Sequence, residues 1–486
     1  MAKKESLKSR DMILPMNGID IESAISNARK LLDKEETLSP ALRSAMEVIL
    51  TLVSLMFNRL GMNSRNSSKP PSTDPNRKRK SRGKGLKRGG QNGHVGTTLK
   101  QMDEADEIKD LRIDRSRLPA GLDYTHAGYE RRQVVDIDIR RIVTEFRAEV
   151  LKDQHGKRYV APFPEGVTRP VQYGNGIKAH AVYLSQYQLL PYGRIEDYFR
   201  DQLHIPISSG TLCNFNQDAC NKLEGFQSWL GDKLSQSSVV HADETGINIG
   251  GKRHWLHCNS NPLLTYYYPH TKRGKEAMDE MGVLPRFAGT LCHDHWKPYY
   301  RYGCTHALCN AHHLRELECA WEQDKQQWAK QMQGLLCEIN TSVHDAGGVL
   351  AVEASKAFRK RYRKLLLEAD VECPPPDESN RKGKRGKLKR SKSRNLLERL
   401  RSYEDDVLRF MDVVSVPFTN NQGENDLRMT KVHQKISGCF RSFEGAICFC
   451  RCRSYISTCR KQGLSSSRAL TLLFDGEIPD FMMGAE

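Results

Sequence analysis

Cysteine is scarce in this sequence, and the N-terminal part lacks it altogether. The chain has 14 cysteines in 486 residues, and none precedes Cys213. Their spacing is not that of a small disulfide-rich secreted domain, so we expect reduced thiols in a cytosol. A chain of this length can bury large cores in roughly two to four domains without covalent links.

Long apolar runs are also missing. The longest, Val48 to Phe57 (VILTLVSLMF), is shorter than the roughly 20 residues that a membrane-spanning helix needs. The segment Met1 to Arg10 (MAKKESLKSR) is not followed by the apolar core of a signal peptide. We therefore expect a soluble cytoplasmic protein with no membrane partner.

Acidic residues are absent from Pro75 to Met102, a stretch rich in Asn, Ser, Pro and Gly that cannot bury a core. It holds eight Lys or Arg between Arg77 and Arg88. The first four are Arg77, Lys78, Arg79 and Lys80. The whole chain has 76 Lys and Arg against 59 Asp and Glu, a net charge of +17, which favours DNA as a partner. A solvated tether in a basic soluble protein is the alternative.

Ahead of this basic linker, apolar residues repeat with heptad-like spacing. They form two adjacent lines: Leu42, Ile49 and Met56, and Met46, Val53 and Leu60. The pattern indicates a short self-associating coiled coil, and therefore a homo-oligomer. An ordinary amphipathic helix packed on its own domain fits so short a pattern equally well.

The next region shows strand-like alternation followed by helical signals. Strands are predicted for Arg132 to Ile139 and Ile142 to Val150. A helix is predicted for about Ile177 to Leu190, and Ser208 and Ser209 have the character of a cap on another. ISSGT at such a helix start also fits a small helix-turn-helix.

Short strands dominate from Ser238 onward. The alternation predicts a three-stranded antiparallel meander, then a helix and two more strands. Their ranges are Val239 to Ile249, Arg253 to Asn259, Leu263 to Tyr268, Lys275 to Met281, Gly289 to His293 and Thr305 to Cys309. From His312 to about Met411 the chain is predicted to be helical, interrupted by three prolines and a second basic run.

Three acids stand out by their place in this order. Asp243 lies within or just past the first strand, Asp294 closes a later strand, and Glu424 opens a helix. This is the element order of an RNase H-like α/β fold, in which such positions converge. Three carboxylates suit Mg²⁺ or Mn²⁺, which can activate water at a phosphodiester. The alternative is that each aspartate only caps a local turn.

Two cations follow Glu424 on the same helix face. Arg428 and Lys431 stand at i+4 and i+7, where they could bind DNA phosphates beside the metal site. An intrahelical pair between Glu424 and Arg428 is the simpler interpretation, and both can hold.

These motifs closely resemble the transposases of the insertion sequence 66 family, from about Leu42 to the C-terminal region. The matching stretches are NSRNSSKPPSTD, GGQNGH, APFPEGV, YLSQYQLLPYGRI, HADETG, CHDHWKPYY, CNAHHLREL and TNNQGENDLR. The resemblance implies a DDE transposase that cuts and rejoins DNA at terminal inverted repeats. It places Asp243, Asp294 and Glu424 on the family's catalytic triad. It also implies an N-terminal coiled coil, a zinc-binding module before the catalytic domain, and small accessory proteins from the same element.

One departure from the family concerns zinc. At the places of its two cysteine knuckles this chain has LPAGL (Leu118 to Leu122) and KDQHG (Lys152 to Gly156). His94, His126 and His155 alone do not make a structural zinc site, so we expect none.

Two further Cys/His clusters have alternative interpretations. Cys309 and His312 resemble the family's Cys-x-x-His element, so His312 and Arg315 are candidates for support of the active site. A buried structural pair is the alternative. The alternating cysteines of ICFCRCRSY do not have zinc-knuckle spacing and are predicted to pack in a core.

The predicted fold class is α/β: an RNase H-like catalytic domain with a helical insertion, preceded by a helical region, a basic linker and a small mixed module. The predicted boundaries are 1–62 (helix or coiled coil), 63–100 (basic linker), 101–170 (β-rich module), 171–235 (helical, DNA-binding or connecting), 236–440 (catalytic, with an insertion at about 318–410) and 441–486 (helical). An inactive end-binding protein and a nuclease without strand transfer remain as alternative functions.

Overall fold

The structure is a computed structural model that describes residues 21–35, 37–60, 62–67, 74, 99–377, 379, 388 and 390–483. Within them the chain forms two units, each described separately below. One comprises Met1–Lys78, Tyr173–Pro191 and Leu212–Glu486, and the other Arg79–Gln172 and Tyr192–Thr211. The basic residues 77–80 lie outside the described residues.

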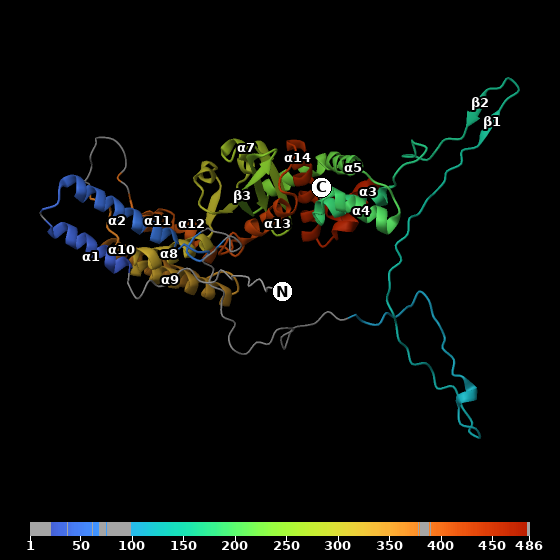
Figure 1. The fold of residues 1–486 in the computed structure, drawn as a ribbon, viewed down its shortest axis with the longest axis horizontal. Coiled ribbons are helices and arrows are strands. Elements are labelled where there is room, and N and C mark those ends of the chain that lie inside the picture. Colours follow the sequence, from blue (N-terminus) through green and yellow to red (C-terminus); the bar gives the residue numbers. More distant parts are fainter. Residues whose placement is uncertain are drawn as a thin grey trace, which may run out of the picture. The chain divides into compact units, whose positions relative to one another are not determined.

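A five-stranded mixed sheet forms the centre of the first unit (Figure 1). Its strands are β3 (Val239–Ile249), β4 (Lys252–Ser260), β5 (Thr265–His270), β6 (Thr290–His293) and β7 (Thr305–Leu308), in the order β5-β4-β3-β6-β7. The first three strands are antiparallel, whereas β6 is parallel to both β3 and β7. The predicted meander and the two later strands are therefore confirmed.

The tight turn between β3 and β4 depends on two glycines. Gly250 and Gly251 have φ of 56° and 80°, a backbone region that glycine adopts without steric cost. The turn sets the register in which Asp243 lies opposite Cys258.

Helices α13 (Asn421–Ser437) and α14 (Phe443–Lys461) pack against the apolar side chains of this sheet. Leu427 and Phe449 join Ile247, Leu256 and Tyr267 in one buried cluster. The three alternating cysteines on α14 are at most 6% exposed, which confirms that they pack in a core. Other helices of the unit are α3 (Asn175–Val182), a π-helix (Tyr183–Tyr187), α6 (Glu224–Ser235), α7 (Lys275–Met281), α15 (Ser466–Asp475) and α16 (Asp480–Met483). The helices predicted from about Ile177 and at Lys275 are thus present.

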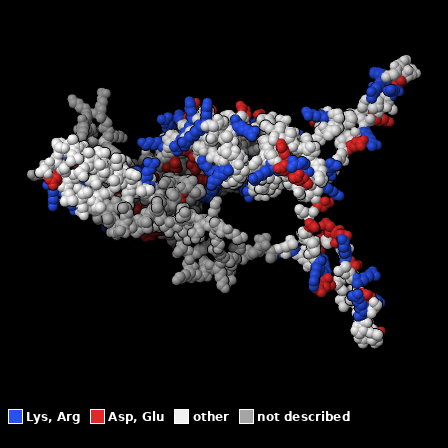
Figure 2. All heavy atoms as spheres, in the orientation of Figure 1, with Lys and Arg blue, Asp and Glu red and all other residues white. Residues whose placement is uncertain are grey.

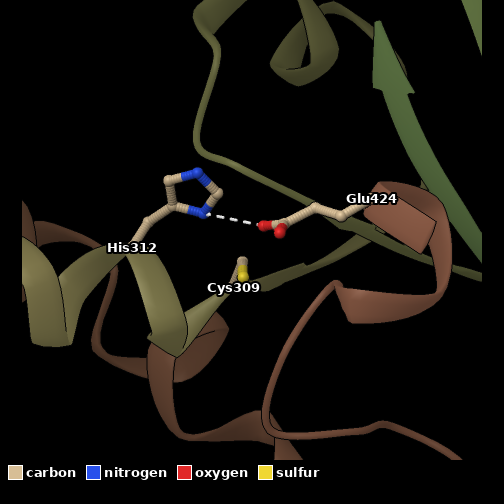
Figure 3. Close-up of side chains that lie close together, drawn as sticks. All are labelled: Cys309, His312 and Glu424. Carbon is tan, nitrogen blue, oxygen red and sulfur yellow. Dashed lines mark ion pairs between the residues drawn. The ribbon is translucent and has the colours of Figure 1, made fainter. Parts of the chain in front are cut away.

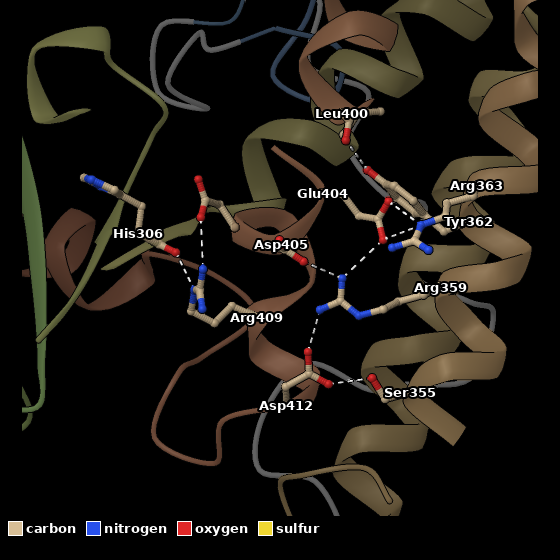
Figure 4. Close-up of polar contacts among 11 residues, drawn as sticks. His306, Ser355, Arg359, Tyr362, Arg363, Leu400, Glu404, Asp405, Arg409 and Asp412 are labelled. Carbon is tan, nitrogen blue, oxygen red and sulfur yellow. Dashed lines mark hydrogen bonds and ion pairs between the residues drawn. The ribbon is translucent and has the colours of Figure 1, made fainter. Parts of the chain in front are cut away.

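A helical insertion follows β7, as the sequence predicted. Its helices are α8 (Asn310–Asp324), α9 (Gln327–Asp345), α10 (Val352–Glu372), α11 (Lys392–Ser402) and α12 (Glu404–Leu408). Arg359 on α10 forms ion pairs with Glu404, Asp405 and Asp412 (Figure 4). Arg409 donates through Nε to the carbonyl of His306 on β7 at 2.6 Å. The bond from Arg409 joins the insertion to the sheet, whereas the ion pairs of Arg359 hold α10 to the segment around α12 within the insertion.

The N-terminal helices α1 (Ile21–Lys34) and α2 (Pro40–Leu60) expose an apolar surface. All six heptad residues of α2 are between 41% and 65% exposed, and Figure 2 shows few charged side chains over these helices. The apolar window runs from Pro40 to Phe57, 18 residues, so α2 is long enough to cross a membrane. The sequence-based length argument was wrong, because it counted only the uninterrupted run and not the whole helix. Length and composition cannot distinguish a membrane span from an oligomerisation helix, because both expose apolar side chains in an isolated chain.

The second unit contains much less β-structure than predicted. Its only strands among the described residues are β1 (Val150–Lys152) and β2 (Arg158–Val160), which form a hairpin (Figure 1). The strands predicted for residues 132–139 and 142–150 do not form, except that Val150 begins β1. Ile137 and Ile142 are 80% and 84% exposed, so the alternating pattern has no buried layer to pack against.

Among its described residues the second unit contains a short 3₁₀ helix (Arg115–Arg117) and the α-helix α4 (Tyr192–Leu203). Helix α5 (Ser209–Lys222) crosses the boundary between the units. The Ser208 hydroxyl accepts the backbone N–H of Thr211 at 3.2 Å, which is the predicted cap. The helix-turn-helix interpretation stays a prediction.

Candidate active site

Asp243 lies in β3, the middle strand of the sheet, and its carboxylate accepts the backbone N–H of Glu244 at 2.9 Å. Burial raises the pKa of Asp243 to about 8, and neighbouring carboxylates add to the shift. Those carboxylates belong to Glu244, Asp294 and Glu424. Two of them are the other acids that the sequence singled out. Because the ionised form is costly here, this group favours either a proton or a cation beside it.

Asp294 follows β6 at the same level of the sheet as Asp243. The parallel register pairs His241 with Cys292, and each aspartate follows two residues later, Asp243 within β3 and Asp294 one residue past the end of β6. The two carboxyl groups are close enough that the charge of Asp294 contributes to the raised pKa of Asp243. Asp294 also accepts the N–H of Trp296 at 3.0 Å, which is the turn-capping bond of the alternative interpretation. The turn-capping bond is therefore present, and it leaves the other carboxylate oxygen of Asp294 without a bond to this turn.

Glu424 lies in the first turn of α13, which packs against β3. The close approach depends on Gly423, where a Cβ atom would lie 3.4 Å from Cβ of Asp243 and 3.2 Å from Nδ2 of Asn420. A residue with a side chain would therefore push the helix away from the strand. This glycine has no distinguishing mark in the sequence beyond its place beside the acid.

Asn420, the residue before α13, connects the elements that carry the acids. Its side chain donates to the carbonyl of Ala242 at 2.9 Å, and its backbone N–H donates to Sγ of Cys309 at 3.1 Å. Its Oδ1 lies 2.7 Å from Nδ1 of His241. With only 2% exposure, Asn420 joins α13 to β3 and to the start of α8. The sequence marked it as a residue before a helix but not as this junction.

His312 and Arg315 on α8 point toward Glu424, as Figure 3 shows for His312. Nδ1 of His312 lies 3.8 Å, and Nη2 of Arg315 lies 3.6 Å, from Oε1 of Glu424. The alternative interpretation paired Glu424 with Arg428 on the same helix, α13. Among the described residues, Glu424 instead forms its ion pairs with His312 and Arg315 on α8. The structure thus brings both predicted supporting residues to the third acid.

Cys309, His312 and Glu424 offer ligand atoms that all lie within 4.8 Å of one another. Burial raises the pKa of the Cys309 thiol, so this sulfur is a poorer ligand than a thiolate would be. Oε1 of Glu424 has no hydrogen-bond partner within the described part of the chain, although it is buried. An unsatisfied carboxylate oxygen is an observation that favours a cation at this place.

The donors of the three acids suit a hard divalent ion. Carboxylate oxygens are the preferred protein ligands of Mg²⁺ and Mn²⁺. The Asp243 carboxyl is buried among other acids, which raises its pKa. One oxygen of Glu424 lies near Arg315 and His312 but accepts no hydrogen bond within the described residues. The residues therefore fit Mg²⁺ or Mn²⁺ better than a soft metal.

A fourth acid, Glu244, was not assigned a role from the sequence. Its side chain is 1% exposed and is bonded by Arg273 and by the hydroxyl of Tyr299. Of the two adjacent acids, Asp243 therefore lies in the candidate site, whereas Glu244 is buried beside the site and bonded to Arg273 and Tyr299. Only the fold distinguishes them, because adjacent residues of a strand point to opposite faces.

The predicted DNA-binding residues are only partly described. Lys431 on α13 donates to the carbonyl of Gly246 at 2.9 Å, so it is attached to β3 close to Asp243, and Arg428 is exposed. Figure 2 shows further Lys and Arg clusters on the face in view, with acidic groups between them.

Comparison with known proteins gives two family matches. The model of the Transposase IS66 family matches residues 170–447, which is more than half of the chain and includes all three acids. A family of unknown function (DUF6444) matches residues 20–100. No curated protein matches the chain.

Proposed function

The chain belongs to the IS66 family of transposases, and on that premise we propose that it cuts DNA at the terminal inverted repeats of an insertion sequence and joins the ends to target DNA. The observation that carries the proposal is the convergence on Asp243, whose pKa is raised to about 8 by burial and by neighbours that include Asp294 and Glu424. Burying an acid in this way costs free energy of folding, and a protein that only bound DNA would gain nothing from it.

We infer an RNase H-like catalytic domain. The strand order β5-β4-β3-β6-β7, with the first three strands antiparallel and the last two parallel to β3, supports it. The placement of Asp243 on β3, Asp294 after β6 and Glu424 on α13 supports it as well.

The three acids would hold Mg²⁺ or Mn²⁺, which supplies an activated water and charge stabilisation at a phosphate when bound. In the cut, the water oxygen bonds to phosphorus and the 3′ oxygen leaves and takes up a proton. The resulting 3′-hydroxyl would then lose its proton and attack a phosphate of the target, whose own 3′ oxygen leaves and takes up a proton. Asp243, Asp294 and Glu424 orient the reacting groups, and Arg315 lies near enough to Glu424 to meet a phosphate oxygen.

The basic linker and the exposed cations of α13 are proposed to hold the DNA. Binding through Arg77, Lys78, Arg79, Lys80 and Arg428 would weaken steeply with salt, because neutralised phosphates release counterions. The small accessory proteins of the same element are further proposed partners.

We propose that α2 joins copies of the chain. Its six heptad residues are all exposed, and their spacing is that of a coiled-coil seam. A cytoplasmic, nucleoid-associated location without membrane contact follows from this role, since oligomerisation would cover the apolar helix.

The proposal is tested by strand cleavage and joining on a labelled terminal-repeat duplex, with the accessory proteins and Mg²⁺ or Mn²⁺ supplied. Wild type should give metal-dependent cut and joined products, and Asp294→Asn should give neither. Asp232→Asn, a surface acid paired with Arg286, is the matched control and should behave as wild type. Tight DNA binding without products from wild type would favour an inactive end-binding protein. Cutting without joining would favour a nuclease.

A further inference from the structure

Arg273, in the loop between β5 and α7, binds the buried carboxylate of Glu244. Its Nε and Nη2 lie 2.9 Å and 2.5 Å from Oε1 of Glu244. The other carboxylate oxygen accepts the hydroxyl of Tyr299 at 2.6 Å. Burial raises the pKa of Glu244, and the bonds from Tyr299 and Arg273 oppose that rise. Both carboxylate oxygens of Glu244 thus accept hydrogen bonds, and these bonds hold the side chain in its buried position beside the candidate site.

The guanidinium of Arg273 is also stacked between two indole rings. It lies 4.9 Å from the ring centroid of Trp255 and 4.4 Å from that of Trp296. Arg253 lies 4.7 Å from the ring centroid of Trp255 as well. Such cation–π contacts are attractive, and a planar guanidinium can in addition stack its plane on a ring, which an ammonium group cannot do.

These contacts converge on the two elements that carry the aspartates. Glu244 is the residue after Asp243 on β3, so the bonds that hold its side chain also restrain the backbone beside Asp243. Trp296 stacks on Arg273 through its ring and donates its backbone N–H to Asp294 at 3.0 Å. Arg273 therefore contacts the immediate neighbour of one aspartate and the hydrogen-bond donor of the other.

We propose that Arg273 is a positioning residue, which holds Asp243 and Asp294 at the separation a divalent ion needs by clamping Glu244 and Trp296 together. This inference rests on the proposed function. It assigns the Trp255–Arg273–Trp296 stack and Glu244 to the support of the metal site rather than to contact with DNA.

A simple charge effect and a positioning effect differ in what they require of residue 273. If only the positive charge mattered, lysine would serve, because it also carries one charge. Lysine cannot provide the two-nitrogen fork to Glu244 or the planar stack between the indoles. Arg273→Lys therefore separates the two effects without changing net charge.

The experiment measures Mn²⁺ binding to the full chain without DNA, by electron paramagnetic resonance. We expect Arg273→Lys to bind Mn²⁺ roughly 10- to 100-fold more weakly than wild type, the usual cost of losing a residue that orients metal ligands. Arg286→Lys is the matched control, because Arg286 forms an exposed ion pair with Asp232 at 2.6 Å, and it should bind Mn²⁺ as wild type does. A thermal melt of each variant, run alongside, separates a loss of folding from a loss of affinity.

Wild-type Mn²⁺ affinity in a folded Arg273→Lys variant would overturn the inference and leave the proposed function standing. If this variant does not fold, Trp255→Leu decides, since it removes one face of the stack and keeps the bonds to Glu244. Weaker Mn²⁺ binding by Trp255→Leu supports the inference, and unchanged binding overturns it. Equal Mn²⁺ binding by wild type and Asp294→Asn would instead overturn the proposed metal site, and this inference with it.

Discussion

Two stretches of this chain have the same alternating pattern and different structures. Residues 239–249 form β3, flanked by β4 and β6 and covered by α13. Residues 132–139 alternate just as regularly, but they form no strand and expose their apolar side chains. Alternation makes a strand only when other elements cover the apolar face, because the pattern itself supplies no partner.

The largest expected contrast between the two stretches is catalytic. Asp243→Asn should lower strand cleavage by roughly 10³-fold or more, since the loss of a metal ligand removes several kcal/mol of transition-state stabilisation. Asp138→Asn, an exposed acid in the other alternating stretch, should change the rate less than about twofold. Single-turnover rates on the same duplex measure both. A similar loss from both substitutions would contradict the distinction.

The second contrast is in stability. Leu256 on β4 is 0% exposed and Ile137 is 80% exposed. Leu256→Ala should lower the free energy of unfolding by about 2–5 kcal/mol through a cavity, whereas Ile137→Ala should change it by less than about 0.5 kcal/mol. Urea denaturation followed by circular dichroism gives both values. Equal effects would mean that residues 132–139 are packed.

The third contrast concerns pH in the absence of divalent ions. Asp243 has a folded pKa of about 8 against an ordinary value of 3.8, so the folded protein binds its proton more tightly than the unfolded chain does. Its contribution to stability is therefore present below about pH 4 and is lost as the pH rises toward 8. Asp243→Asn should flatten the fall in melting temperature across this range, and Asp138→Asn should not. An identical pH profile in wild type and Asp243→Asn would rule this out.

The smallest contrast is steric. Gly423→Ala would place a Cβ atom 3.2 Å from Nδ2 of Asn420, the atom that bonds the carbonyl of Ala242. The Asn420 amide must shift to make room and would move Glu424 slightly, so cleavage should fall by roughly tenfold, equivalent to about 1.4 kcal/mol. Gly225→Ala on α6 is the control, because a Cβ atom there meets nothing within 4 Å. If the two variants cleave at the same rate, the close approach at Gly423 has no effect on cleavage.

The sequence predicted much of the sheet and the three acids, for a physical reason. In the meander, neighbouring strands are consecutive in the chain, so local pattern and final structure agree. The strands ending near His293 and Cys309 were recognised from their apolar residues, although β6 pairs with β3 from a distant part of the chain. The positions of Asp243, Asp294 and Glu424 followed from element order.

What the sequence could not supply were contacts between distant residues. Asn420 bonds to Ala242, and Arg273 bonds to Glu244, and no local pattern marks either pair. The strands predicted at 132–139 and 142–150 fail because burial depends on what surrounds a segment. The apolar span of α2 was underestimated for another reason, because only its uninterrupted apolar run was counted.

The central claim is that three acids from β3, β6 and α13 form one metal site. Anomalous diffraction from crystals soaked in Mn²⁺ tests it most directly. The account predicts a peak with oxygens of Asp243, Asp294 and Glu424 at about 2.1 Å, close to the distances of other small divalent ions. A peak held by Cys309, His312 and Glu424 without either aspartate would contradict it.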